Sequence, residues 1–412
     1  MSVKTFLVNL RSKINANALP LPYKFVTGNQ SADMDSVISA VSYSYFENLK
    51  DNNSYVIPLV NIPKEDLKLR RDIESLLQSH SITEDLLYFL EDFEILSGGA
   101  TNELILVDHC NIQGDLLHQR MNEGKLKVVS IIDHHADEGV FLDSHPRIIH
   151  SNGSNSCLVF NYWYDQLGRN DALLKQNSDI IELLLGPLLI DTSNMTQKVE
   201  EGDVSAFSKY KQILDLGAGN APIIKQFVGP DAGDDIVAGF YKKLKTAKKD
   251  LSGFRFVDVL RKDYKQFSFL SGDNVGFSSI GKSLKWVLSN YTIEEIRETL
   301  SKALVDFNVD ALVITSSYTQ KETNIYTREF CYYYEDKANA RFNELDSLVK
   351  EPLQLNDSVY GADKVGTKLT KVNTDSKGIF KIYNQVNIKA SRKQVVPIVK
   401  EALEKYSLDH TL

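Results

Sequence analysis

The chain has 412 residues, a length that favours two domains over one. Its formal net charge of −8 at pH 7 argues against broad nucleic-acid binding, which usually needs a basic face. The apolar fraction of 42% is typical of globular proteins, and no apolar run approaches the roughly 20 residues that a membrane span needs. We therefore expect no nucleic-acid or membrane partner. An anionic substrate stays open, because bound cations can reverse the local field.

From residue 23 to about residue 192, strand and helix patterns alternate. Strands are predicted at 23–26, 55–60, 103–108 and 128–133, and helices at 36–49, 66–78, 155–167 and 178–190. Apolar strands that alternate with helices predict an α/β fold with a doubly wound, mainly parallel sheet. In such a sheet the ligand lies beyond the carboxyl ends of the strands, so polar residues that follow the strands are candidate site residues.

A composition shift predicts where the domains divide. The stretch that begins with 216–222 is rich in Gly, Ala and Pro, and it predicts a linker over 216–235 between a catalytic domain (1–215) and a second domain (236–412). The second half is mixed. It contains a basic helix at 240–249, strands near 310–315, 323–333 and 378–386, and a last helix at 392–405.

The cysteines and the N-terminus bear on location. Cys110, Cys157 and Cys331 lie far apart, without a C-x-x-C pair or a zinc spacing. Unpaired thiols fit a reducing compartment, so we predict a cytoplasmic protein. The basic, weakly amphipathic stretch 5–14 leaves the mitochondrial matrix as an alternative, because a presequence has this character. We favour a short capping helix there.

Acidic residues follow several of the predicted elements. Asp33 and Asp35 precede a helix, and two carboxylates this close repel each other unless a cation lies between them. Helix capping is the alternative for this pair. Asp108 ends a buried-type strand and is followed by His109. Asp191 ends an apolar helix, where its charge opposes the helix dipole, so a nearby cation would be favourable.

The run Asp133-His134-His135 is more specific, since it follows a strand directly. It offers a metal ligand, a second imidazole for proton transfer or phosphate contact, and a carboxylate that orients one ring. A surface loop with two histidines is the alternative. Arg392 and Lys393 open the last helix, an unfavourable place for cations unless they bind an anion such as phosphate. A solvated basic turn also remains open.

In this order and spacing, these motifs resemble the DHH phosphoesterase superfamily. The matching segments are 28–36, Val107-Asp108-His109, Asp133-His134-His135 and Asp191-Thr192. The second half looks like the smaller, DHHA2-type domain of the pyrophosphatase branch, marked by Ser391-Arg392-Lys393-Gln394. Within that branch the whole chain is similar to fungal cytosolic exopolyphosphatases, through 62–72, 158–164 and 190–195. The resemblance implies a mixed α/β second domain and an active site in the cleft between the domains.

The resemblance also implies a metal-dependent phosphoric anhydride hydrolase with two divalent ions, Mg²⁺ or Mn²⁺. The implied metal ligands are Asp33, Asp35, Asp108, His134 and Asp191, with Asp108 shared between the ions. His135 would contact the phosphoryl oxygens or protonate the leaving oxygen, and Arg392 and Lys393 would neutralise the terminal phosphate. Asn29, Asp133 and His109 would lie near the metals or behind their ligands. Further phosphate contacts are implied for Ser154, Asn155 and Lys198.

The implied reaction is the release of orthophosphate from the ends of inorganic polyphosphate by a water that two metals activate. Asn29 stands where family II pyrophosphatases have a histidine. An amide oxygen is a weaker and harder ligand than imidazole, so Mg²⁺ should be accepted more readily if Asn29 ligates at all. Pyrophosphatases commonly have a histidine after the aspartate that corresponds to Asp108, as this chain has His109. An inorganic pyrophosphatase of the same fold is therefore the alternative. We expect a monomer.

Overall fold

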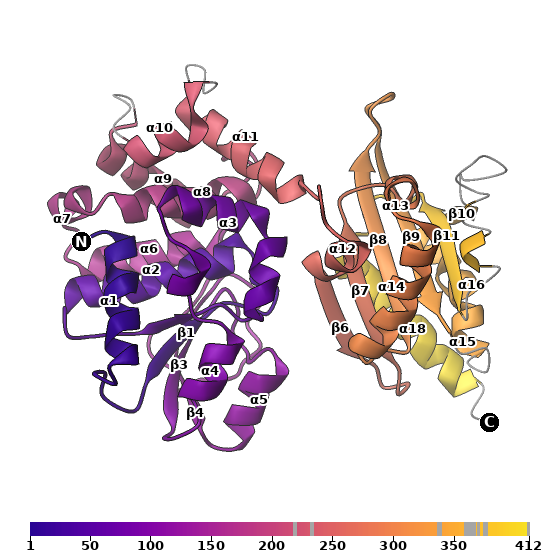
Figure 1. Cartoon of the computed structure of the whole chain (residues 1–412), viewed down its shortest axis with the longest axis horizontal. Coiled ribbons are helices and arrows are strands. Elements are labelled where there is room, and N and C mark those ends of the chain that lie inside the picture. The colour runs from indigo at the N-terminus through magenta and orange to yellow at the C-terminus, as the bar shows by residue number, and fades with distance from the viewer. Residues whose placement is uncertain are drawn as a thin grey trace. The chain divides into compact units, whose positions relative to one another are not determined.

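The computed structural model describes residues 1–216, 221–230, 235–335, 340–357, 368, 371–373 and 378–409 (Figure 1). The chain forms two compact units, Met1–Asp250 and Leu251–Leu412. Among the described residues, no helix is both long enough and apolar enough to cross a membrane.

The first unit is built on a five-stranded parallel sheet, which confirms the predicted doubly wound fold. Its strands are β1 (Lys24–Thr27), β2 (Ile57–Leu59), β3 (Asn102–Val107), β4 (Leu126–Asp133) and β5 (Arg147–Ile149), in the order β2-β1-β3-β4-β5. Strands β1, β3 and β4 are neighbours and run in the same direction. The residues that follow them therefore meet at one edge of the sheet.

Helices make up the rest of this unit. They are α1 (Val3–Asn15), α2 (Met34–Lys50), α3 (Arg71–Ser79), α4 (Leu90–Leu96), α5 (Asp115–Asn122), α6 (Asn155–Gln166), α7 (Asp171–Gln176), α8 (Asp179–Asp191), α9 (Glu201–Leu214), α10 (Pro222–Val228) and α11 (Ile236–Lys249), with short 3-10 turns at Lys64–Leu69 and Glu84–Leu86. Figure 1 shows α2, α6 and α8 gathered on one side of the strands, and these three helices contact one another. The α1 helix buries Phe6, Leu7 and Leu10 completely, so the helix predicted near the N-terminus is part of this core.

The helix predicted over 66–78 is interrupted. A 3-10 turn covers Lys64–Leu69, Arg70 leaves the helical conformation at φ −109° and ψ 67°, and α3 then begins. The guanidinium of Arg70 explains the break, because it donates to two main-chain oxygens. Nε lies 3.0 Å from the oxygen of Ser31 and 2.9 Å from that of Ala32, and Nη2 lies 2.6 Å from the oxygen of Ser31. The break thus ties α3 to the loop that precedes Asp33.

The two units divide at Asp250 and Leu251, whereas the composition predicts a linker over 216–235. Of that predicted linker, residues 217–220 and 231–234 lie outside the described residues. The basic helix, which the sequence assigns to the second domain, belongs to the first unit as α11. The physical reason is its apolar face, since Phe240 and Leu244 are fully buried in the core of that unit.

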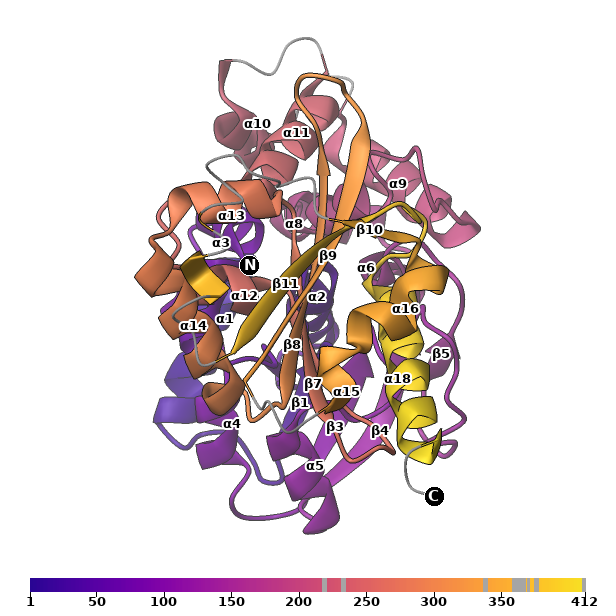
Figure 2. The ribbon, with the colours of Figure 1, turned by 90° about the vertical axis from the view of Figure 1, so that its right-hand side faces the viewer.

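The second unit is a six-stranded mixed sheet between two helical layers (Figure 2). The strand order is β10 (Leu355–Asp357), β11 (Ile379–Gln385), β9 (Tyr326–Tyr334), β8 (Ala311–Thr319), β7 (Asn274–Ile280) and β6 (Tyr264–Ser268), and only β7 and β8 pair in parallel. The helices are α12 (Phe256–Lys262), α13 (Leu284–Asn290), α14 (Ile293–Asp306), α15 (Ala340–Asn343), α16 (Leu345–Leu353) and α18 (Arg392–Asp409).

Both faces of this second sheet are buried, as the alternation along β8 shows. Leu312 and Ile314 pack against the layer of α12, α13 and α14, and Ala311 and Val313 pack against the layer of α16 and α18. Side chains on a strand point alternately to its two faces, so a continuous apolar run of this kind serves two cores. The predicted mixed α/β second domain is confirmed.

Candidate metal centre

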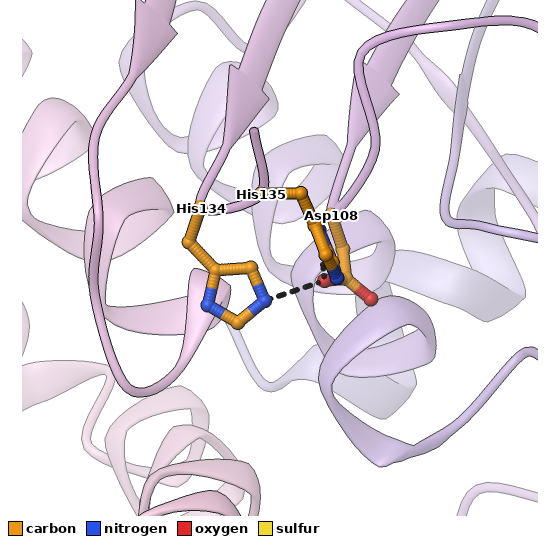
Figure 3. A group of neighbouring side chains, drawn as sticks. All are labelled: Asp108, His134 and His135. Atoms are coloured by element: carbon orange, nitrogen blue, oxygen red, sulfur yellow. Dashed lines mark ion pairs between the residues drawn. The ribbon is translucent and has the colours of Figure 1, made fainter. Parts of the chain in front are cut away.

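Three of the predicted site residues meet directly at the ends of β3 and β4. Asp108 Oδ1 lies 3.0 Å from His134 Nε2 and 3.7 Å from His135 Nδ1. In Figure 3 both imidazoles approach Asp108 from the end of the neighbouring strand. One nitrogen or oxygen of each of the three side chains lies within 4.8 Å of the others, which is close enough for one ion to contact all three. The register explains the meeting, because Val107 pairs with Ile132.

Asp33 and Asp35 come from the start of α2. Asp33 is exposed and caps the helix by accepting from Ser36 N at 3.1 Å, as the capping alternative predicts. Asp35 is only 2% exposed, and its Oδ2 lies 3.9 Å from His134 Nε2. Gly28 permits this approach of loop and helix, since a Cβ at that position would lie 2.4 Å from Ser36 Cβ. Because Asp33 caps α2, Asp35 lies in the first turn of this helix, where its carboxylate reaches the cluster.

Asp191 joins the cluster from the last residue of α8. Its Oδ2 is fully enclosed and has no hydrogen-bond partner among the described residues. Burial raises the pKa of Asp191 well above its usual range, and the charges of Asp35, Asp33 and Asp108 act in the same direction. The positive charge of Lys248 on α11 lowers the pKa of Asp191. An enclosed carboxylate oxygen without a partner is costly unless a cation binds it.

The charges of the cluster call for cations. Burial raises the pKa of Asp108 to about 7, and Asp33 and Asp35 add to that effect. Burial also raises the pKa of Asp35, opposed by His134 and reinforced by Asp33. Burial alone lowers the pKa of His134, but its hydrogen bond to Asp108 and the charge of Asp35 raise it to about 10. The carboxylates repel one another, and their charge favours the protonated form of the nearby imidazole. Divalent cations bound between them would relieve that repulsion.

Asn29 contacts Asp108 with its amide nitrogen. Nδ2 donates to Asp108 Oδ2 at 2.7 Å, while Oδ1 accepts from Ser31 N at 2.9 Å and from the Ser31 hydroxyl. A main-chain N–H can only donate, so the amide atom that faces Ser31 is the oxygen. The Asn29 amide therefore orients a carboxylate of the cluster and has its own oxygen engaged.

Asp133 lies behind the histidines. Its Oδ1 accepts from His135 Nδ1 at 2.8 Å and from His134 N at 2.8 Å, so it orients the His135 ring. That ring side chain is 48% exposed. His109 is buried, and its Nδ1 donates to Val107 O at 2.9 Å. Burial lowers the pKa of His109 to about 4, so the ring is neutral near pH 7.

The structure gives two of the predicted phosphate contacts another role. The Ser154 hydroxyl and the Asn155 main-chain N–H both donate to Asp35, and both residues are fully buried. Their donors are therefore directed to a carboxylate of the cluster instead of to solvent, where a phosphate would enter. Lys198 is exposed on the segment between α8 and α9, and its predicted role stays a prediction.

Arg392 and Lys393 belong to the second unit, at the start of α18. Arg392 donates to Asp263 from both ends of its guanidinium, Nη1 to the main-chain oxygen at 2.6 Å and Nη2 to Oδ1 at 2.7 Å. This partner offsets the unfavourable position of an arginine at a helix N-terminus. Lys393 is exposed. Their contact with substrate stays a prediction.

The sequence did not single out Asn152, whose main-chain oxygen accepts from His134 Nδ1 at 2.9 Å, or Lys248 beside Asp191. A main-chain contact depends on loop geometry and leaves no residue signature. The sequence indicates Lys248 only as one of several lysines of a basic helix, because the pattern does not show that the apolar face of this helix packs in the first unit. Arg70 lay within a segment of family resemblance, but its contact with the Asp33 loop had no signal of its own.

The chain is similar to known proteins in sequence and in fold. Residues 24–186 match the family described as "DHH family, N-terminal domain", and residues 242–402 match the DHHA2 domain. A Schizosaccharomyces pombe protein named "Putative exopolyphosphatase" is 31% identical over 420 residues, which cover 98% of this chain and 99% of that protein. Mus musculus "Exopolyphosphatase PRUNE1" is 27% identical over 390 residues, 93% of this chain and 76% of its own.

Two pyrophosphatase-named proteins are also similar. An Archaeoglobus fulgidus protein named "Probable manganese-dependent inorganic pyrophosphatase" is 23% identical over 287 residues, 68% of this chain and 77% of its own. The crystal structure of a Methanococcus jannaschii "putative family II inorganic pyrophosphatase" has a TM-score of 0.53 and 19% identity, and covers 92% of this chain and 99% of that chain. This last likeness shows the fold. Together with the match over the full chain, these findings show that the chain belongs to the DHH family, with a DHH domain followed by a DHHA2 domain.

Proposed function

We propose that this protein is an exopolyphosphatase that uses two divalent cations, held by Asp33, Asp35, Asp108, His134 and Asp191. The observation that carries the proposal is the cluster itself. Burial and the neighbouring carboxylates raise the pKa values of Asp35, Asp108 and Asp191, and one enclosed oxygen has no partner among the described residues. Oxygen and imidazole ligands suit Mg²⁺ and Mn²⁺. Bound there, such ions would lower the pKa of a water and polarise a phosphoryl oxygen.

The protein's own residues support the other parts of the reaction. Asn29 fixes the orientation of Asp108, and Asp133 fixes that of His135. The hydrogen bond to Asp133 raises the pKa of His135, while burial acts against it. Since Nδ1 of this half-exposed ring faces Asp133, Nε2 is the nitrogen that can hold a proton for the leaving phosphate oxygen. Arg392 and Lys393 are proposed to bind the terminal phosphate.

The relatives' names support polyphosphate as the substrate, because the protein that matches the chain over its full length and the mouse protein are both named as exopolyphosphatases. We also propose a cytoplasmic location and a monomer. All three cysteines are free and buried, as in proteins of reducing compartments.

The test is phosphate release from pyrophosphate, tripolyphosphate and long-chain polyphosphate, each with Mg²⁺ and with Mn²⁺. We expect release from the two polyphosphates, at a kcat/KM at least tenfold above that for pyrophosphate. A preference for pyrophosphate would favour the alternative, an inorganic pyrophosphatase, which the Archaeoglobus relative's name supports. Absence of hydrolysis under both metals would contradict both activities.

Asn29→His is expected to shift metal preference toward Mn²⁺. The amide nitrogen of Asn29 lies 2.7 Å from Asp108 Oδ2, so an imidazole at this position would bring a nitrogen ligand beside the cluster. Nitrogen ligands favour Mn²⁺ over Mg²⁺. We expect the ratio of Mn²⁺ to Mg²⁺ affinity, measured by calorimetry, to rise by about tenfold. The control is Asn111→His, at an exposed contact outside the cluster. An unchanged ratio would show that residue 29 does not reach the metals.

A further inference from the structure

One loop contacts two of the proposed metal ligands. The main-chain oxygen of Asn152 accepts from His134 Nδ1 at 2.9 Å. A carbonyl oxygen can only accept, so Nδ1 carries a proton and Nε2 is left to face the cluster. Two and four residues later, the Ser154 hydroxyl and Ser156 N donate to Asp35 Oδ1 at 2.7 and 2.8 Å. The segment 152–156, which consists of the end of a loop and the first two residues of α6, therefore sets the orientation of an imidazole and of a carboxylate together.

This loop is held in turn by a single buried carboxylate, Asp203, near the start of α9. Its Oδ1 accepts from Asn152 Nδ2 at 2.7 Å and from Ser154 N at 3.1 Å. Its Oδ2 accepts from Gly153 N at 2.7 Å and from Glu200 N at 2.9 Å. Asp203 is 0% exposed, so its charge depends on these four donors in place of water.

The fit between the loop and Asp203 is tight. A Cβ at Gly153 would lie 2.7 Å from Asp203 Oδ2 and 2.5 Å from the main-chain oxygen of Lys198. The loop can approach the carboxylate this closely only because glycine has no side chain. A change at Asp203 therefore releases three consecutive residues, 152 to 154, which include the contact to His134 and the Ser154 hydroxyl contact to Asp35.

We propose that Asp203 is a positioning residue of the metal centre. It holds the loop residues 152–154, at the start of the segment 152–156, so that His134 Nε2 and the oxygens of Asp35 face the same ion. The inference rests on the proposed function only in taking the cluster as a metal site, and the identity of the phosphate substrate does not enter it. Residues that orient metal ligands in this way typically account for about 10- to 100-fold in metal affinity.

The test is Mn²⁺ binding to the full chain by isothermal titration calorimetry, after metal removal with a chelator. Asp203→Asn keeps the size of the side chain but replaces one acceptor oxygen with a donor, so two of the four N–H groups lose their acceptor. We expect the Mn²⁺ dissociation constant to rise by about 10- to 100-fold, and saturating Mn²⁺ to restore most of kcat. The matched control is Glu201→Gln, which removes an exposed carboxylate from the same helical turn and should leave the affinity unchanged.

A purely structural role would give a different result. In that case Asp203→Asn would lower the melting temperature while the folded protein bound Mn²⁺ within twofold of wild type, and the inference would be overturned. Asn152→Ala is the second variant, should Asp203→Asn not fold, because it removes only one donor to Asp203. We expect a severalfold rise in its Mn²⁺ dissociation constant, and no rise would overturn the inference. Tight Mn²⁺ binding by wild type without polyphosphate hydrolysis would contradict the proposed reaction and leave this inference intact.

Discussion

Asp108→Ala is expected to reduce phosphate release by at least ~1000-fold, which corresponds to roughly 4 kcal/mol of transition-state stabilisation. Asp108 is the residue on which the cluster converges, since His134, His135 and Asn29 all contact its carboxylate. Its loss removes a charge that we propose two ions share. The measurement is kcat/KM for long-chain polyphosphate at saturating Mn²⁺, together with Mn²⁺ affinity by calorimetry.

Folding and chemistry can be separated with two further variants. Asp108→Asn keeps the volume and one acceptor oxygen for Asn29, and should be almost as inactive because the carboxylate charge is gone. Asp143→Ala removes an exposed aspartate of the same unit and should keep wild-type turnover. If Asp108→Asn is folded by circular dichroism and still turns over within tenfold of wild type, the assignment of Asp108 as a shared ligand is wrong.

The parallel sheet and the meeting of the acidic residues could both be predicted because they follow from local patterns. The apolar strands that became β3 and β4 end directly before Asp108 and at Asp133. Once such strands are neighbours in a parallel sheet, their ends must lie at one edge. No knowledge of loop geometry was needed, and the structure brings Asp108 together with both histidines, as that pattern predicts.

The contacts that orient the cluster could not be predicted in this way. The oxygen that fixes His134 is a main-chain atom of Asn152, and any residue type would supply it. Asp203, which holds that loop, lies about fifty residues further along the chain on a helix with an ordinary capping pattern. The family resemblance implies phosphate contacts for Ser154 and Asn155, and hydroxyl and helix N–H groups bind any anion. The structure provides the nearer anion, the carboxylate of Asp35.

The composition of α11 does not predict the unit to which this helix belongs. Its lysines dominate the composition of that segment, but burial of Phe240 and Leu244 decides which unit it joins. Two fully buried apolar side chains contribute about 3 to 6 kcal/mol relative to exposure. Exposed lysines on the opposite face cost little, so an amphipathic pattern is the better guide to a boundary than a Gly- and Pro-rich stretch.

Arg392→Ala is expected to lower kcat/KM for polyphosphate by roughly 100-fold and to leave Mn²⁺ affinity unchanged. A hydrogen bond to a charged group contributes about 1.5–3 kcal/mol, which matches a loss of this size. Asp263 contacts Nη1 and Nη2 of Arg392 and thereby holds the guanidinium in one orientation. We propose that its remaining N–H groups bind a phosphate, so the loss should appear with the substrate and not with the metal.

Two variants sharpen this prediction. Arg392→Lys keeps the charge but cannot form the forked contact with Asp263, so it should recover only part of the lost kcat/KM. Lys400→Ala removes an exposed cation from the same helix, α18, and should behave as wild type, which excludes a general effect of net charge. Weaker Mn²⁺ binding by Arg392→Ala would show that Arg392 acts on the metal centre instead of the phosphate. Arg392 and Asp108 belong to different units of the chain, so the double variant tests whether they act independently. Losses of kcat/KM that add in free energy would indicate two independent contacts with one substrate. A loss no greater than that of Asp108→Ala would mean that the arginine acts only once the metals are in place.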